Sequence, residues 1–171
     1  MILNVGCGGR PQDKACYLGD VRIDVARFPP VTVLMDAHFL GFIDSVFDKI
    51  VCFEVLEHLD SPIKALKEFK RVLKADGEII ISVPNIWYWR RIFRALLNRG
   101  KILCKPSKTD HKQAWDVYEF HNLVNQVGLK IIDVKWLNWY EGKRKFQLLD
   151  GLIKVIPQIG CTHLMLRLKN C

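Results

Sequence analysis

The sequence predicts an α/β fold in which a mostly parallel sheet carries helices on both faces. Seven runs rich in β-branched and apolar residues are spaced along the 171 residues and indicate strands. These runs are Met1–Val5, Val21–Val25, Val31–Met35, Lys49–Phe53, Glu78–Val83, Lys130–Leu137 and Cys161–Leu168. Several are apolar at consecutive positions, which is typical of strands covered on both faces. Helical patterns lie between them, and this alternation favours parallel strands joined by right-handed crossovers.

The clearest helical pattern runs from Ser61 to Leu73. Its apolar residues recur at helical spacing and form one stripe, made of Ile63, Leu66, Phe69, Val72 and Leu73. Ser61 suits the N-cap and Pro62 the first helical position. Gly77 is expected to mark the stop before the next strand.

Three further helices are expected. One covers Asp116–Gln126 and ends at Gly128, one covers about 87–98, and a short stretch over Phe146–Ile156 is stopped by Pro157. No repeat, low-complexity segment or linker interrupts the pattern. Residues 1–171 are therefore expected to form a single domain.

A glycine-rich turn, Gly6-Cys7-Gly8-Gly9, follows the first strand-like run. In open parallel sheets, ligands bind beyond the carboxyl ends of the strands, where glycine lets the backbone approach them closely. Pro11 stands where a dinucleotide-binding loop needs its third glycine, and the chain has no G-K-[ST] of a P-loop. The turn alone leaves open whether it holds a ligand or only reverses the chain.

Carboxylates end the next two strand-like runs. Asp24 ends the second run, where it can accept the hydrogen bonds of a ribose diol, and Asp36 ends the third, where it can meet an exocyclic amino group. Each aspartate taken singly also suits a turn or a helix cap. Three successive strand ends that carry a glycine turn, Asp24 and Asp36 form a more specific set.

These motifs together resemble the class I S-adenosylmethionine-dependent methyltransferases, in particular the small ones often labelled type 11. The resemblance is carried by L-N-V-G-C-G-G (3–9), R-I-D-V (22–25), V-L-M-D-A (33–37), F-D-K-I-V-C-F-E-V-L-E-H-L (47–59) and A-L-K-E-F-K-R-V-L-K-A-D-G-E-I-I-I-S-V-P-N (65–85). It is close from residue 1 to about 85 and looser beyond. It implies a Rossmann-like, seven-stranded, mostly parallel sheet with an antiparallel terminal strand. It also implies S-adenosylmethionine as cofactor and methyl transfer as the activity.

The same resemblance implies where the cofactor is bound. The glycine turn would lie against its methionine part, the first carboxylate would hold the ribose, the second would meet the adenine, and the end of the fourth strand would receive the amino group. The expected cofactor-binding residues are Asn4, Gly6, Cys7, Gly8, Asp24, Asp36, Ala37, Phe53 and Glu54.

The chain departs from the family pattern at two positions. Asn4 stands where the family usually has Asp or Glu, and Arg10 stands where it often has a third glycine. Asn4 can hydrogen-bond but has no charge to pair with the methionine ammonium. A second interpretation therefore stays open: a non-catalytic module of the same fold that binds nucleic acid, a membrane or a protein partner through a basic face.

Methyl transfer mainly requires in-line positioning in a dry pocket, with a base only if the acceptor must lose a proton. Glu54, Glu57 and His58 follow the fourth strand-like run, and the last two are read as an ordinary polar helical turn. His111 lies in the segment that helps to build the acceptor pocket in this family. It is the candidate catalytic residue, as base or acceptor contact, and a plain surface histidine is the alternative.

The formal net charge of +8 is concentrated in the C-terminal half. Lys and Arg cluster between Arg90 and Lys112 and again at 143–145, and the segment 86–115 combines this charge with Trp and Phe. Such a segment fits a lid over a small or lipid-linked anionic acceptor. Peripheral membrane contact, nucleic-acid binding or a helix that only covers its own core remain alternatives.

The six cysteines are scattered, and no pair has C-x-x-C spacing. We expect free thiols and a cytoplasmic protein, because the N-terminus shows no signal peptide, and no metal site, because the sequence shows no cluster of ligands. The sequence predicts neither the acceptor nor the oligomeric state.

Overall fold

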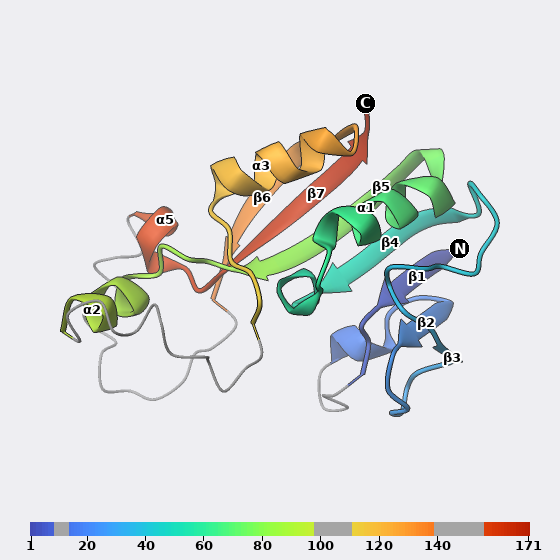
Figure 1. Ribbon diagram of the computed structural model, residues 1–171, viewed down its shortest axis with the longest axis horizontal. Coiled ribbons are helices and arrows are strands. Elements are labelled where there is room, and N and C mark those ends of the chain that lie inside the picture. The colour runs from blue at the N-terminus through green and yellow to red at the C-terminus, as the bar shows by residue number, and fades with distance from the viewer. Residues whose placement is uncertain (9–13, 98–110, 139–155) are drawn as a thin grey trace.

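The computed structural model describes residues 1–8, 14–97, 111–138 and 156–171 (Figure 1). All seven expected strands are present. They are β1 (Ile2–Val5), β2 (Val21–Asp24), β3 (Val33–Leu34), β4 (Phe47–Phe53), β5 (Leu73–Pro84), β6 (Leu129–Leu137) and β7 (His163–Asn170). They form one sheet in the order β3-β2-β1-β4-β5-β7-β6. Strands β1 to β5 pair in parallel, whereas β7 runs antiparallel to both β5 and β6. The predicted fold class is confirmed.

The described helices are α1 (Pro62–Val72), α2 (Trp89–Leu97), α3 (Val117–Gln126) and α5 (Pro157–Gly160), with 3-10 turns η1 (Lys14–Tyr17) and η2 (Leu56–His58). One predicted boundary is wrong. Helix α1 ends at Val72, and Leu73 already adopts an extended backbone and begins β5, so Gly77 lies inside a strand. Pro157 begins α5, since proline suits the first helical position. The predicted helical stretch up to residue 155 lies outside the described residues.

The helix caps follow the sequence in part. Asp116 accepts a hydrogen bond from Glu119 N (2.8 Å) and Glu119 reaches back to the Asp116 amide, which completes a capping box on α3. Ser61 occupies the N-cap position of α1, but its side chain makes no capping hydrogen bond. The last turn of α1 binds the end of α3, because Lys70 Nζ donates to the carbonyls of Val127 and Gly128.

Helices α1 and α3 pack against each other and cover one face of the sheet (Figure 1). The strand register places fully buried side chains on this face: Leu3, Ile50, Ile79 and Leu168 in one row, and Val5, Cys52, Ile81 and Leu166 in the next. Phe69, Val72 and Phe120 from the two helices complete the same core. Burial of such side chains contributes about 1.5–3 kcal/mol each.

The opposite face is more polar. Asn4, buried in β1, donates from Nδ2 to the carbonyls of Ala15 (2.9 Å) and Leu18 (3.1 Å), so η1 lies on this side. Farther along the sheet, Glu78 binds Lys49 (2.6 Å) on β4 and Arg167 (2.8 Å) on β7. Two cations from neighbouring strands thus share one carboxylate.

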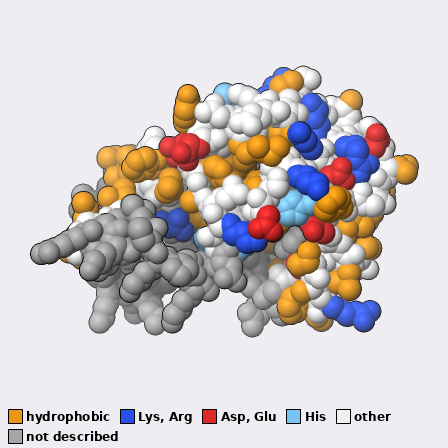
Figure 2. Space-filling model, viewed as in Figure 1, with side chains coloured by type: hydrophobic (Ala, Val, Ile, Leu, Met, Phe, Trp, Pro, Cys, Tyr) orange, Lys and Arg blue, Asp and Glu red, His pale blue; other side chains and the backbone are white. Residues whose placement is uncertain are grey.

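Charges of both signs are interspersed over the α1 side of the surface in Figure 2. Most of the basic clusters expected from the sequence fall within 98–110 and 139–155, outside the described residues. Among the described residues, no helix is both long and apolar enough to span a bilayer. Cys7 and Cys52, which are buried, and Cys171, which is exposed, form no disulfide within the described part of the chain.

Candidate active site

The glycine turn lies at the carboxyl ends of β1 and β2. Gly6 has a φ of +72° and its amide donates to Ile23 O on β2 (2.8 Å). A Cβ at Gly6 would lie 2.1 Å from Val55 Cγ2, in the loop after β4. Both the left-handed backbone and the close approach of Val55 therefore require glycine here. The turn joins the ends of three neighbouring strands.

Gly8 and Asp24 are in direct contact. The Gly8 amide donates to Asp24 Oδ2 (2.8 Å), and the Ala26 amide donates to Asp24 Oδ1 (3.0 Å). A Cβ at Gly8 would lie 2.7 Å from Asp24 Oδ2 and 2.9 Å from a ring carbon of Phe28. The turn thus leaves just enough room for the carboxylate, which is held at the rim with further lone pairs for a ligand.

Asp36 lies beside this pair, after β3. The Met35 amide donates to Asp24 O (3.0 Å), which joins the two strand ends. Asp36 Oδ1 accepts from the His38 amide (2.8 Å) and contacts the His38 ring (2.7 Å), and these contacts lower the pKa of Asp36. The Ser61 amide approaches the other ring nitrogen of His38 at 3.3 Å. Gly8 and Asp24 are thus in contact, and Asp36 follows the strand that pairs with the one that Asp24 ends.

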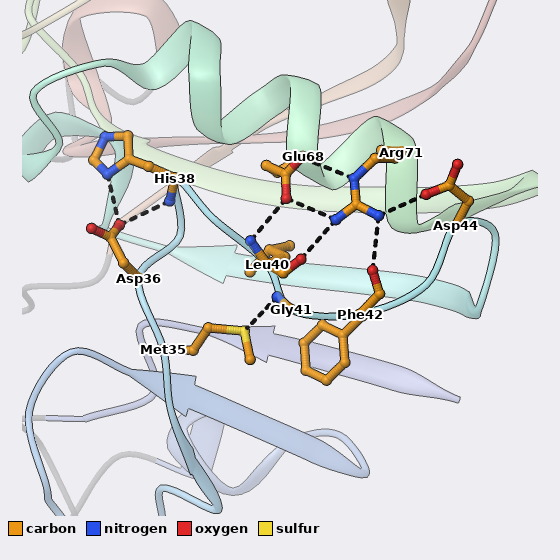
Figure 3. A network of polar contacts seen from close by, with 9 residues as sticks. All are labelled: Met35, Asp36, His38, Leu40, Gly41, Phe42, Asp44, Glu68 and Arg71. Atoms are coloured by element: carbon orange, nitrogen blue, oxygen red, sulfur yellow. Dashed lines mark hydrogen bonds and ion pairs between the residues drawn. The ribbon is translucent and has the colours of Figure 1, made fainter.

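The loop that carries Asp36 is fixed to α1 by Arg71 (Figure 3). The guanidinium donates to Leu40 O (2.7 Å), Phe42 O (2.8 Å) and Asp44 Oδ1 (2.7 Å), and it pairs with Glu68 (2.8 Å). Glu68 in turn accepts from the Leu40 amide (2.8 Å). No sequence pattern predicts this network, which orders the chain on which Asp36 is placed.

The structure shows the neighbours of two expected cofactor-binding residues, Asn4 and Cys7. Asn4 uses its amide nitrogen to hold η1, as described above. Cys7 is buried at the turn, and burial together with the charge of Asp24 raises the pKa of its thiol to about 11. Cys7 therefore behaves as a neutral, apolar lining residue at ordinary pH.

The end of β4 is polar and conformationally unusual. Glu54 has a φ of +56°, a left-handed conformation that non-glycine residues rarely adopt and that clusters at functional sites. Its Oε1 accepts from Ser82 Oγ (2.8 Å) and its Oε2 lies 3.1 Å from His163 Nε2. Partners from β5 and β7 thus hold the side chain, while Phe53 and the Glu54 backbone stay at the strand end.

A second cluster follows immediately. Glu57 is fully buried, and neither of its carboxylate oxygens has a hydrogen-bond partner on another of the residues that the structure describes. Burial, and then the negative charge of Glu54, raises the pKa of Glu57 to about 8. His58 and His111 lie beside it, with ring centroids 4.7 Å apart, and the nearest ring nitrogen of His58 is 3.9 Å from Glu57 Oε1.

His111 reaches this place through its chain neighbours. The amides of Lys112 (2.8 Å) and Gln113 (3.2 Å) donate to Glu57 O, and Asn85 pairs with Trp115 as an isolated bridge. Burial, followed by the positive charges near it, lowers the pKa of His111. The expected acceptor-side histidine is thus a neutral imidazole next to the β4 end.

Part of the expected acceptor-side segment, 86–115, is described. Helix α2 lies beyond the carboxyl end of β5 (Figure 1). The positive charge of Arg91 is close enough to Glu57 to lower its pKa. The side chains of Phe93, Leu96 and Leu97 are exposed. Within the described residues, α2 therefore has an apolar surface that packs against no core.

A glycine turn and two carboxylates at the carboxyl ends of β1, β2 and β3, on a sheet of order 3-2-1-4-5-7-6, define a Rossmann-like fold of the class I methyltransferase type. Residues 3–81 match the family model described as "Methyltransferase domain". The match spans the turn, both aspartates, β4 and α1.

The sequence is similar to uncharacterized proteins and to a methyltransferase. An uncharacterized protein of Methanocaldococcus jannaschii is 46% identical over 114 residues, which cover 62% of this chain and 49% of that protein. A ubiquinone biosynthesis O-methyltransferase of Coxiella burnetii is 23% identical over 165 residues, or 86% of this chain and 70% of that one. The chain spans about half the length of the two Methanocaldococcus jannaschii relatives that it matches, 47% and 49%.

Among solved structures, a SAM-dependent methyltransferase of Thermotoga maritima superposes with a TM-score of 0.69 at 17% identity, over 99% of this chain and 82% of that one. This likeness concerns the fold. The family match covers residues 3–81, and the solved structure supports the same Rossmann-like fold over the whole chain.

Proposed function

We propose that this protein transfers the methyl group of S-adenosylmethionine to a small or lipid-linked anionic acceptor. The observation that carries the proposal is the contact between Gly8 and Asp24. A backbone bent against a carboxylate at the carboxyl ends of parallel strands is a site for a ribose and the groups attached to it. The family match over the same residues supports this cofactor.

The residues present fit the cofactor in shape and chemistry. A Cβ at Gly6 or Gly8 would fill the space beside the turn, so glycine keeps it open. Asp24 would accept from the ribose hydroxyls, Asp36 and Ala37 would border the adenine, and Phe53 with the Glu54 backbone would border the amino group. Cys7 would line the floor as a neutral thiol, because its pKa is raised to about 11.

When bound, S-adenosylmethionine supplies a methyl group already activated by a sulfonium. The chain therefore has to orient the acceptor oxygen, nitrogen or carbon in line and keep water away. His111 is the residue that we propose contacts the acceptor. Its lowered pKa keeps the imidazole neutral near pH 7, so a ring nitrogen can accept a hydrogen bond or a proton.

The anionic character of the acceptor is proposed from the charge near α2. Arg91 lies close to the β4 end, and the sequence adds more Lys and Arg on either side of it. Arginine favours carboxylate and phosphate groups. The ubiquinone biosynthesis enzyme among the relatives is consistent with a small or lipid-linked acceptor. We keep a cytoplasmic location as part of the same proposal.

Calorimetry with S-adenosylmethionine and S-adenosylhomocysteine tests cofactor binding, and labelled cofactor with fractionated cell extract tests transfer. The proposal predicts saturable binding of both and label in a small-molecule or lipid fraction. Binding of neither compound would contradict it. Label found only in RNA or protein would retain the activity and overturn the acceptor class.

The non-catalytic module remains a second candidate, because Asn4 holds η1 with its amide and has no charge for the methionine ammonium. It predicts salt-sensitive binding to nucleic acid or anionic vesicles and no transfer to any fraction. Transfer to any acceptor would exclude it.

A further inference from the structure

The cluster of Glu57, His58 and His111 has the composition of a metal site. One carboxylate oxygen and one nitrogen from each imidazole lie within 4.8 Å of one another. Two ligands on one ion of zinc size, each about 2.0–2.2 Å from it, lie roughly 3–4 Å apart. The 3.9 Å between Glu57 Oε1 and the His58 ring nitrogen already meets this spacing. Small side-chain rotations would bring His111 into it.

The state of Glu57 is an independent reason to expect a ligand. Its side chain is fully buried, and within residues 1–8, 14–97, 111–138 and 156–171 neither oxygen has a hydrogen-bond partner, with the His58 ring 3.9 Å away. A buried carboxylate without a partner costs several kcal/mol by order of magnitude. A cation held between Glu57 and the two imidazoles would give the buried carboxylate oxygens a partner.

We propose that Glu57, His58 and His111 bind a divalent transition-metal ion at the acceptor side of the site. Two histidines and one carboxylate suit zinc, iron, cobalt or manganese and leave coordination positions open. Val55 lies against the Gly6 position, and Glu57 follows Val55 by two residues in the chain. The cluster therefore adjoins the glycine turn. An oxygen of the acceptor would take an open position, and with the ion bound His111 would orient the acceptor through the ion instead of accepting its proton directly.

Arg91 is the competing cation. Its charge is close enough to lower the pKa of both Glu57 and His111. In the proposed arrangement, Arg91 meets the anionic acceptor and the ion compensates Glu57. An Arg91→Gln variant separates the two cases, since it removes the guanidinium and leaves all three ligands in place.

The role toward the acceptor rests on the proposed function, whereas metal uptake is measured without cofactor or acceptor. The full-length protein is stripped with chelator, dialysed against Co²⁺ or Zn²⁺ and examined by metal analysis and visible absorption. We expect one ion per chain and Co²⁺ bands without a thiolate charge-transfer band. Loss of an outer-shell partner alone weakens metal binding by 10–100-fold, so Glu57→Gln and His111→Ala should weaken it by at least about 100-fold.

The matched control is His121→Gln, which removes an exposed histidine on α3 that contacts only Asn125 in its hydrogen bonds as described. It should bind the ion as the unmodified protein does, and Arg91→Gln should bind it at least as tightly, because a competing positive charge is removed. Lack of uptake by the folded, unmodified protein would overturn the metal site. Equal affinity in Glu57→Gln or equal loss in His121→Gln would do the same, and none of these results would touch cofactor binding.

Discussion

Replacing Gly8 with alanine should damage the cofactor site by pushing Asp24 out of place. The added Cβ would lie 2.7 Å from Asp24 Oδ2, 2.9 Å from Asp24 Cγ and 2.9 Å from the Phe28 ring. Carbon atoms do not approach this closely, so the carboxylate and the ring must both move. Overpacking of this kind costs about 1–3 kcal/mol.

The effect on cofactor affinity follows from the same displacement. A hydrogen bond to a charged group contributes about 1.5–3 kcal/mol. If Asp24 loses one such bond to the ribose, the dissociation constant for S-adenosylmethionine should rise roughly 10- to 150-fold. Isothermal calorimetry measures this change, and urea unfolding measures the loss of stability.

Gly41→Ala is the matched control, because a Cβ there would meet only the Met35 Cε, at an ordinary 3.5 Å. It should bind the cofactor with the affinity of the unmodified protein. Gly8→Ala binding as tightly as Gly41→Ala would refute the placement of the cofactor beside Asp24.

Two further predictions concern stability and reactivity. Arg71→Gln should lower the free energy of unfolding by roughly 1–3 kcal/mol, because the carbonyls that bind the guanidinium lose their donor. The control Lys67→Gln should change it by less than about 0.5 kcal/mol. A urea titration measures both variants. Cys7 should react with iodoacetamide far more slowly than the exposed Cys171 at pH 8 and should speed up as pH rises towards its pKa of about 11, which peptide mapping can follow; equal rates at pH 8 would contradict the burial of its thiol.

The strands could be predicted from the sequence because runs of β-branched residues are a local pattern. Their parallel arrangement could be predicted because strands and helices alternate along the chain. The end of α1 could not. Leu73 continues the apolar stripe of the helix, yet it pairs with Phe47 at the start of β5. Tertiary pairing with β4 therefore decides a boundary that helical periodicity leaves open.

The candidate site also has one part that could be predicted from the sequence and one part that could not. The glycine turn and Asp24 follow strands directly, so the rule that parallel strand ends meet at one edge was enough to bring them together. Glu57 and His111 are distant in sequence and meet because the Lys112 amide binds the Glu57 carbonyl. The sequence pattern indicates an ordinary polar turn at Glu57 and His58. Only the structure shows that Glu57, on one side of this turn, is buried.

The role of Asp24 is tested most directly by calorimetry with S-adenosylmethionine on the Asp24→Asn variant. The exposed Asp76→Asn is its control. The asparagine keeps the size of the side chain but loses the charge and one acceptor, so the dissociation constant should rise at least about tenfold. Asp24→Asn and Asp76→Asn with the same affinity would contradict a ribose-binding carboxylate at the end of β2.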